Sequence, residues 1–456
     1  MSEKREIATG WNRRQFITRT AGAGAALAVA GLVPQPRARS KDLVNGKITV
    51  GCVGVKGRGN ALFNHFGSVP EQVDVKYVCD IDSEVLGRRA GEFEKRFGRA
   101  PERVADFRRL LDDKSIDAVT LGTPDHWHAL QTIHACQAGK DVYCEKPDGH
   151  NLEEGQVMTA AAKKYGRVVQ LGTQARSDPH LLELVEYIKA GHLGRVVMAK
   201  AWESSPQKNL GNPPDSEAPS TIDYDVWLGP APKRQFNPLR FHGNWRWFFD
   251  YGSGDLGNDG VHRLDIARWM LETAVAASGE KPLGLPRSVS ASGGKYYFDD
   301  AQEWPDTMLV TYDYPGRLLS YEMRVWAPYP IDGEDEGAAV FGDKGYLIIG
   351  NKRWRHFQGR KAELVKEVQR GSAAEMTHVH NFLDCMRSRG KPNADLETVG
   401  RVSSLLCHLG NVAWRAGRTV KFDYEAYKFT GDPEAEKFRT RAEYRKPYSL
   451  PAVDAV

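Results

Sequence analysis

The sequence predicts an α/β protein with two folded domains. Over residues 46–172, short apolar and β-branched runs alternate with helical patterns, and this alternation gives a parallel sheet with helices on both faces. Over residues 173–430, strand-like segments with polar alternation are followed by two helical patterns, as in an α+β domain. The length of 456 residues agrees with two to three domains, and residues 431–456 are left as a C-terminal tail.

The composition and the charge distribution exclude several classes of protein. Apolar residues make up 41% and charged residues 27%, which excludes a disordered or collagen-like chain. Residues 1–40 hold seven Lys or Arg and two Glu, so the rest of the chain holds 56 basic and 57 acidic residues. A body this close to neutral gives no reason to expect a nucleic-acid partner. The six cysteines are scattered without a CxxC pair, so we expect buried thiols rather than a disulfide framework.

The first 40 residues predict a signal peptide of the twin-arginine type. Arg13 and Arg14 are followed by Phe16, by a run of small and apolar residues over 21–33, and by a small-residue stretch near Ala38. The apolar run is shorter than the roughly 20 residues that span a bilayer, so we expect no stable membrane span after cleavage. This pattern predicts export to the periplasm. A disordered basic tail and an uncleaved anchor are the alternatives.

Five segments of the first domain have the character of buried strands. They are short, apolar and rich in β-branched residues, and they cover 47–55, 73–80, 116–124, 141–147 and 167–174. Helical patterns lie between them at 58–67, 83–97, 126–138 and 152–165. In a parallel sheet of this kind the ligand binds at the carboxyl ends of the strands. Residues that carry chemistry are therefore expected just after each strand.

The second domain is expected to contain strands with one polar face. The candidates are 195–204, 287–298, 307–314, 318–327 and 337–350, and the closing helices are expected at 376–388 and 396–416. Segment 205–244 is rich in Pro, Asn and Gly. Because a connection of this length is usually functional or disordered, we expect it to cross over the site as an ordered excursion.

The first strand-to-helix turn has most of a dinucleotide-binding motif. It reads Gly54-Val55-Lys56-Gly57-Arg58-Gly59, so it keeps the first and third glycines of GxGxxG and places Lys56 at the second. That second position normally lets the backbone approach a pyrophosphate, so the substitution weakens the motif, although Gly57 is adjacent. Asp80 follows 21 residues after Gly59, at the end of the second strand.

Asp80 favours NAD as the cofactor. An acid at this place binds a ribose 2′-hydroxyl and repels a 2′-phosphate. The alternative is that Asp80 caps helix 83–97, a role that Asp82 or Ser83 can also fill. Arg88 and Arg89 lie further along that helix and keep NADP as the alternative cofactor.

Several further motifs follow in a fixed order. They are Thr123-Pro124-Asp125-His126, Cys144-Glu145-Lys146-Pro147, GTQARSDP (172–179), GDLGNDGVHRLDIARW (254–269), FGDKGYL (341–347) and HNFLDCMRSRGKPNADLETVGRV (380–402). With the glycine turn, this ordered set resembles the Gfo/Idh/MocA oxidoreductase family over most of the mature chain. The resemblance implies a Rossmann domain followed by an α+β domain with an open, mainly antiparallel sheet that covers the nicotinamide. It also implies a homo-oligomer, since this sheet often packs against another subunit.

The resemblance also assigns roles to single residues. It implies that Lys146 and His262 are catalytic. The cofactor contacts that it implies, together with the motif above, are Gly54, Lys56, Gly57, Arg58, Gly59, Asp80, Thr123, Pro124, His126, Glu145 and Lys146. Many members carry Asp four residues before the histidine, whereas this chain has Asn258 there and Asp259 one place later. Asparagine can hydrogen-bond a substrate hydroxyl but cannot take a proton, so the full Lys/Asp/His triad is in doubt.

The chemistry of hydride transfer agrees with this assignment. Oxidation of an alcohol leaves a hydroxyl proton, which a base with a pKa near 7 removes best, and His262 suits that role. A cationic Lys146 would stabilise the developing alkoxide charge. The alternatives are a histidine packed at a helix start and a surface lysine.

Candidate substrate contacts surround these two residues. Gln174 and Arg176 lie at and just after the end of the last strand segment of the first domain, 167–174, and Asn258, Asp259 and His262 share one motif. Trp245 and Trp247 belong to an aromatic stretch over 245–251 that suits a sugar ring, with core packing as the alternative. The pairs His126/His128 and His378/His380 lack a third ligand nearby, so we expect no metal.

The predicted compartment narrows the function. An exported enzyme finds little free NAD(P), so a dehydrogenase that released its cofactor at every turnover would stall. We therefore expect an NAD(P)-dependent oxidoreductase that acts on a hydroxyl of a sugar or cyclic polyol and holds its cofactor tightly. One alternative is a redox-neutral, NAD-dependent enzyme that cleaves glycosides or epimerises sugars. The other is a non-catalytic sugar- or cofactor-binding protein.

Overall fold

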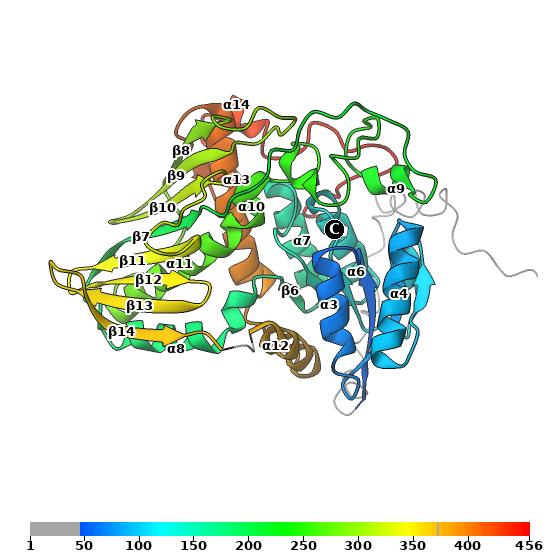
Figure 1. The fold of residues 1–456 in the computed structure, drawn as a ribbon, viewed down its shortest axis with the longest axis horizontal. Coiled ribbons are helices and arrows are strands. Elements are labelled where there is room, and N and C mark those ends of the chain that lie inside the picture. Colours follow the sequence, from blue (N-terminus) through cyan, green and yellow to red (C-terminus); the bar gives the residue numbers. More distant parts are fainter. Residues whose placement is uncertain (1–45, 372–373) are drawn as a thin grey trace, which may run out of the picture.

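The computed structural model describes residues 46–371 and 374–456, whose two large sheets lie side by side (Figure 1). The predicted signal peptide, residues 1–40, lies outside the described residues. Within the described part of the chain, no helix has both the length and the apolar character needed to cross a membrane.

The first sheet is parallel throughout and has the strand order β3-β2-β1-β4-β5-β6. Its strands are β1 (Ile48–Val53), β2 (Val73–Cys79), β3 (Glu102–Val104), β4 (Ala118–Leu121), β5 (Asp141–Cys144) and β6 (Val169–Leu171). The five predicted strands are confirmed, but several are shorter than their apolar runs, because the last residues of each run enter the loops. The sequence analysis missed β3, which has three residues, two of them exposed.

Helices connect these strands as predicted. They are α3 (Arg58–Gly67), α4 (Ser83–Phe97), α6 (Asp125–Gln137) and α7 (Leu152–Lys164), with a short α5 (Arg108–Asp112) in addition. Side-chain caps set two of the starts: Asp82 accepts bonds from the backbone N–H groups of Glu84 and Val85 before α4, and Asn151 caps α7. Gly98, with φ +73°, ends α4 in the left-handed conformation.

The second sheet has eight strands in the order β14-β13-β12-β11-β7-β10-β9-β8. They are β7 (Val196–Glu203), β8 (Ser288–Gly294), β9 (Thr307–Tyr314), β10 (Arg317–Arg324), β11 (Glu336–Gly342), β12 (Tyr346–Gly350), β13 (Arg353–Gln358) and β14 (Glu363–Gln369). All neighbours are antiparallel except β7 and β10, so the predicted, mainly antiparallel sheet is confirmed. The predicted strand segment 337–350 is a hairpin of β11 and β12, and the final pair, β13 and β14, was not predicted.

Helices cover one face of the second sheet. They are α8 (Pro179–Lys189), α11 (Gly260–Ala277) and α13 (Arg401–Ala416), and a π-helical turn η3 (Leu396–Gly400) precedes α13. Alternate residues of β9 and β10, such as Tyr312 and Leu319, are fully buried beneath them. The opposite face leaves Leu309 and Leu318 exposed.

Two late segments return to the first domain. Helix α12 (Ala374–Ser388) buries Phe382 against Phe66 of α3, with ring centroids 6.3 Å apart. The short strands β15 (Phe422–Asp423) and β16 (Lys428–Phe429) come before residues 431–456, which were expected as a tail. These residues begin with the short helix α14 (Pro433–Glu436) and then run back along the first domain (Figure 1). The last residue, Val456, is 3% exposed and belongs to the core cluster of that domain.

Candidate active site

A cavity of about 200 Å³ lies where β1, β2, β4 and β5 end. This is the edge at which a parallel sheet binds its ligand. The predicted site residues that line it are Gly54, Lys56, Gly57, Arg58, Asp80, Thr123, Pro124, Glu145, Lys146, Trp245 and Asn258. The tertiary structure thus brings together residues that lie up to about 200 positions apart in the chain.

The glycine turn is shaped for close backbone packing. Gly54 has φ +74°, and a Cβ on Gly59 would lie 1.7 Å from the carbonyl oxygen of Gly54. A Cβ on Gly57 would meet nothing within 4 Å. Gly57 precedes α3 without a side-chain cap, so backbone N–H groups at the start of α3 are left for a ligand. A phosphate group fits such a helix start.

Asp80 is held in place by the backbone. Its carboxylate accepts bonds from Val55 N at 2.9 Å and from Asp82 N at 3.1 Å, and burial raises its pKa. Asp82 caps α4, so the alternative prediction that Asp80 supplies this cap is wrong. Arg89 donates to the carbonyl of Lys56 at 3.0 Å and braces the turn from outside the cavity.

Lys146 is oriented by a single residue of the second domain. Its Nζ donates to the carbonyl oxygen of Asn258 at 2.6 Å and to Asn258 Oδ1 at 2.9 Å. Asn258 in turn donates from Nδ2 to Asp259 Oδ2 at 2.9 Å. With Asn in place of Asp at position 258, Lys146 still has two fixed acceptors at the end of helix α10 (Gly254–Asn258).

His262 lies in the first turn of α11, outside the residues that line the cavity. Burial, followed by the positive charge of Lys146, lowers the pKa of His262 well below its ordinary value. The imidazole is therefore neutral at pH 7. No hydrogen bond joins its ring to another residue of the described chain, so both ring nitrogens are left to a ligand or solvent.

Glu145 and Arg58 connect the cavity to the returning helix α12. Arg58 Nε donates to Glu145 Oε1 at 2.9 Å, and Arg58 Nη2 donates to Glu375 Oε2 at 2.7 Å. Gln174 lies below the cavity lining, with Nε2 at 3.4 Å from Glu145 Oε1. Glu375 was not predicted, because no local pattern connects it to a turn more than 300 residues earlier.

Arg176 lies outside the cavity and is engaged by a buried acid. Its Nε and Nη2 donate to the two carboxylate oxygens of Asp265 at 2.9 and 2.7 Å. Asp265 is fully buried, so this bidentate pair ties α11 to the segment η1 (Gln174–Ser177). The guanidinium expected to contact substrate is thus bonded within the protein.

His126 and Trp247 also lie outside the cavity. The ring nitrogens of His126 lie 3.2 Å from the carbonyl of Tyr251 and 2.9 Å from that of Trp227. Trp247 is 2% exposed and packs in the core of the second domain, whereas Trp245, two residues earlier in η2 (Asn244–Trp247), reaches the cavity. Gly59 and Asp259 complete the set of predicted residues that do not line it.

The excursion over 205–244 does cross the site, as expected. It arches over the first domain towards α9 (Tyr224–Leu228), and Trp227, Phe241 and His242 line the cavity (Figure 1). Ser83 N donates to the carbonyl of Thr221 at 2.9 Å, and His242 Nε2 donates to Asp82 Oδ2 at 2.6 Å. We call residues 221–246 the cover segment. The length and composition of 205–244 indicated an excursion over the site, but the contacts of the cover segment with the first domain were not predictable from the sequence.

His128 positions two loops of the cavity. Its Nδ1 lies 2.7 Å from the carbonyl of Pro147, and its Nε2 lies 2.8 Å from the carbonyl of Thr123. The side chain thus ties the Lys146 loop to the loop after β4. Within the described chain, no group of three or more His, Cys, Asp or Glu is arranged to hold a metal ion, and all six cysteines are buried and unpaired.

Two buried acids lie behind Asn258. Burial, followed by the nearby Asp259, raises the pKa of Asp255 to about 8. Burial, followed by Asp255 itself, raises the pKa of Glu203 to about 9. Both side chains are 1% exposed, so they are protonated and neutral in the folded protein at pH 7.

Comparison with family models decides what this arrangement belongs to. Residues 48–173 match the model described as "Oxidoreductase family, NAD-binding Rossmann fold", and residues 206–450 match "Oxidoreductase family, C-terminal alpha/beta domain". The chain belongs to the Gfo/Idh/MocA family. Its first domain is accordingly an NAD-binding domain, and the protein is an oxidoreductase. The glycine turn, the free start of α3 and the fixed Asp80 suit the phosphate and ribose groups of that cofactor.

Relatives within the family resemble the chain at low identity. The scyllo-inositol 2-dehydrogenase (NAD(+)) of Bacillus subtilis is 24% identical over 289 residues, which cover 62% of this chain and 71% of that enzyme. A levoglucosan dehydrogenase solved with NADH and levoglucosan has a TM-score of 0.63 at 19% identity, covering 82% of this chain and 99% of the other. An aldose-aldose oxidoreductase from Caulobacter crescentus has the same TM-score at 20% identity, covering 82% and 100%. These structural similarities concern the fold.

Proposed function

We propose that this oxidoreductase acts on a hydroxyl group of a sugar or cyclic polyol. The observation that carries the proposal is the juxtaposition of an oriented cation and a neutral base. Lys146 is held at 2.6 and 2.9 Å by Asn258, and its charge lowers the pKa of the unbonded His262. The family relatives named above act on inositol and levoglucosan, which are polyhydroxylated rings.

The residues divide the chemistry between them. When held by the glycine turn and Asp80, NAD would supply a hydride acceptor for the carbinol carbon of the substrate. The neutral imidazole of His262 takes the hydroxyl proton. The ammonium of Lys146 stabilises the negative charge that develops on the same oxygen, and Asn258 keeps it directed there. In the opposite direction, protonated His262 returns the proton to the oxygen as a carbonyl compound is reduced.

We further propose that the cofactor stays bound between turnovers. The cover segment closes over the cavity and is bonded to the β2 loop at Asp82 and Ser83, on the same loop as the ribose-binding Asp80. With a retained cofactor, one substrate is oxidised and a second carbonyl compound is then reduced. The aldose-aldose oxidoreductase among the structural neighbours has a name that describes such a paired reaction. NAD is the expected cofactor, and NADP is the alternative.

Retention also agrees with the proposed location. We propose that residues 1–40 direct the folded, cofactor-loaded protein to the periplasm by the twin-arginine route. The open face of the second sheet, with Leu309 and Leu318 exposed, supports a homo-oligomer formed through that face. Light scattering of the purified protein, with charged substitutions at these two leucines, measures the oligomeric state.

Substitution of Lys146 and His262 tests the catalytic proposal. We expect Lys146→Met and His262→Gln each to lower kcat on a responsive sugar or inositol by about 10²–10³-fold. Lys163→Met is the matched control, since Lys163 is 77% exposed and lies on α7 outside the cavity. Two variants that both turn over at the wild-type rate would refute the assignment.

Mass spectrometry tests the retention proposal. Ligand released by denaturing the purified protein should be NAD or NADP at close to one molecule per chain. Steady-state kinetics with a sugar donor and a carbonyl acceptor should then give parallel double-reciprocal lines. Free exchange of added cofactor during turnover would contradict retention, but it would leave the roles of Lys146 and His262 intact.

A further inference from the structure

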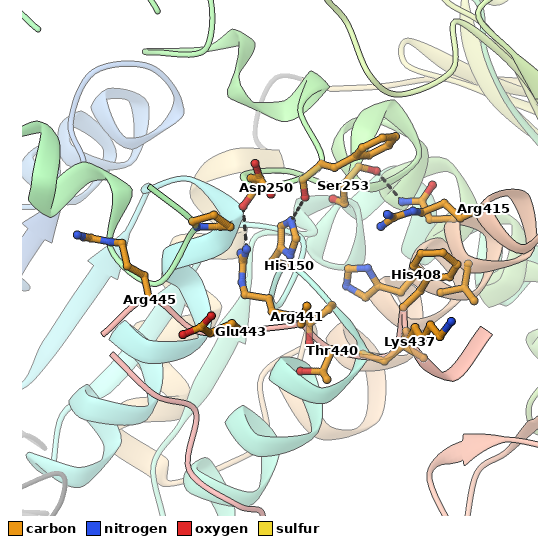
Figure 2. Close-up of a pocket in the computed structure, with 18 of the residues that line it drawn as sticks. His150, Asp250, Ser253, His408, Arg415, Lys437, Thr440, Arg441, Glu443 and Arg445 are labelled. Atoms are coloured by element: carbon orange, nitrogen blue, oxygen red, sulfur yellow. Dashed lines mark hydrogen bonds between the residues drawn. The ribbon is translucent and has the colours of Figure 1, made fainter. Parts of the chain in front are cut away.

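A second cavity of about 750 Å³ lies outside the site described above (Figure 2). It opens between the C-terminal part of α13, the loop before α10 and residues 437–446 of the returning chain. None of the predicted site residues lines it. Its volume is in the range of pockets that hold a small organic ligand.

The wall between the two cavities is a short, fixed segment. Trp245 and Arg246 line the first cavity, and Phe249, Asp250 and Ser253 line the second. Ser253 Oγ donates to the buried Asp125 Oδ2 at 2.7 Å, which pins this wall to the start of α6. The two cavities are therefore distinct compartments with one common wall.

The lining of the second cavity is rich in cations. It contains Lys233, Arg415, Lys437, Arg441, Arg445 and Lys446, against two acids, Asp250 and Glu443. Three of the cations, Lys233, Arg415 and Lys446, form no ion pair with any other residue of the described ranges. Arg415 is held over the rings of Phe249 and Phe438, with its guanidinium carbon 4.7 and 4.1 Å from the ring centroids. A positive group that is fixed in position and not neutralised is suited to bind an anion.

Polar atoms without partners lie in the same wall. They are Arg441 Nη2, His150 Nδ1 and Asn411 Oδ1, and each is buried with no hydrogen-bond partner, whereas His408 Nε2 lies 3.8 Å from Asp148 Oδ1. Figure 2 shows His150, His408 and Arg441 next to one another along the lining. Because buried polar groups are normally bonded, such a cluster points to a ligand or ordered solvent.

The types of these atoms indicate what the ligand carries. His150 Nε2 donates to the carbonyl of Phe249 at 2.7 Å, and burial lowers the pKa of His150 well below its ordinary value, so Nδ1 is an acceptor. Asn411 Nδ2 donates to the carbonyl of Ser253 at 2.7 Å, which leaves Oδ1 as an acceptor. Acceptors of this kind bind hydroxyl groups, and the arginines bind a carboxylate or phosphate.

We propose that the second cavity binds a small hydroxylated anion, namely a sugar that carries a carboxylate or a phosphate group. The ligand occupies this compartment without reaching Lys146 or His262. Arg415 binds the anionic group. Arg441, whose Nε pairs with Glu154 Oε1 at 3.4 Å, adds its unpartnered Nη2 as a second donor, and the unpaired acceptors bind hydroxyl groups.

Calorimetric titration of the purified, cofactor-loaded protein tests this proposal. The probes are glucuronate, glucose 6-phosphate, neutral glucose and inorganic phosphate, all at low ionic strength. Arg415→Met removes the charge and keeps the apolar contacts with Phe249 and Phe438. Lys446→Met, at the exposed rim, is a second and independent variant. Arg418→Met is the matched control, since Arg418 lies just beyond the same helix, pairs with Asp432 and does not line the cavity.

The expected result is binding of glucuronate, glucose 6-phosphate or both, with Arg415→Met weakening the affinity at least about tenfold and Arg418→Met leaving it unchanged. Lys146→Met should not change this binding, which separates the second cavity from the catalytic site. Loss of binding in Lys146→Met but not in Arg415→Met would overturn the proposal. So would equal binding of neutral glucose, equal binding of inorganic phosphate alone, or no binding of any probe.

Discussion

Gly57 and Gly59 lie two positions apart in one turn, yet their surroundings differ. A Cβ on Gly59 would lie 1.7 Å from the carbonyl of Gly54, whereas a Cβ on Gly57 would meet nothing within 4 Å. We expect Gly59→Ala to destabilise the protein by about 1–3 kcal/mol, because the turn must move apart, and to weaken cofactor binding. Gly57→Ala should unfold at the wild-type denaturant concentration. Chemical denaturation followed by circular dichroism compares the two, and equal stabilities would contradict this account.

Asn258 shows how one residue type changes the design of the site. An aspartate there would add a third acid beside Asp255 and Asp259, where burial, followed by the charge of Asp259, already raises the pKa of Asp255 to about 8. The asparagine still supplies two acceptors to Lys146 without that repulsion. In the proposed mechanism, removal of the substrate proton is thus left to His262.

The contact of the cover segment with the β2 loop leads to a prediction about the rate of cofactor release. His242→Ala removes the bond to Asp82 Oδ2, so the segment should open more often and the cofactor should dissociate at least about tenfold faster. The control is Glu217→Ala, an exposed position on the same excursion that does not line the cavity. Stopped-flow fluorescence of bound reduced cofactor measures the rate. An unchanged rate in His242→Ala would show that the segment does not retain the cofactor.

Helix α12 couples the two domains through several buried side chains, of which Phe382 is the largest. Phe382 is fully buried and lies against Phe66 and Tyr143 of the first domain. Phe382→Ala should lower the free energy of unfolding by about 3–5 kcal/mol, since it leaves a cavity at this contact. The substitution should also shift Glu375, which lies on the same helix, and weaken its hydrogen bond with Arg58. Cofactor affinity should therefore fall as well. Thermal unfolding and cofactor titration measure both effects, and a loss below 1 kcal/mol would contradict the coupling role.

The pH dependence of stability is a property of the whole molecule, and two buried carboxyl groups contribute to it. Asp255 and Glu203 have pKa values of about 8 and about 9 in the folded protein, well above those of unfolded carboxyl groups. Folding therefore takes up protons at pH values between the unfolded pKa of about 4 and these folded pKa values. Stability is lost over this range as pH rises towards 8 and 9. Each group contributes a slope of at most about 1.4 kcal/mol per pH unit.

Removal of the titrating groups tests this origin. We expect Asp255→Asn and Glu203→Gln each to flatten the fall in stability between about pH 5 and 8, where both folded carboxyl groups hold a proton that the unfolded ones have lost. Urea unfolding at several pH values gives the slope. A wild-type slope in both variants would place the proton uptake elsewhere.

The sequence by itself determined the order of elements and the positions of the chemical groups along the chain. Short apolar runs that alternate with helical patterns specify the parallel sheet, because a strand that is buried on both faces is apolar along most of its length. The glycine turn and Asp80 were predictable because each directly follows a strand and strand ends of one sheet meet at one edge, whereas the role of Lys146 was implied by the family resemblance.

Only the tertiary structure decided which of the candidate side chains face the cavity. Trp245 lines it and Trp247 packs in the core, although they are the same residue type two positions apart. Arg176 is engaged by Asp265, and Arg58 is engaged by Glu375 from a helix that returns late in the chain. The second cavity is also formed by such a return, through residues 437–446. Local periodicity reports whether a side chain is buried, but its partner depends on contacts between distant segments, and these exist only once the chain has folded.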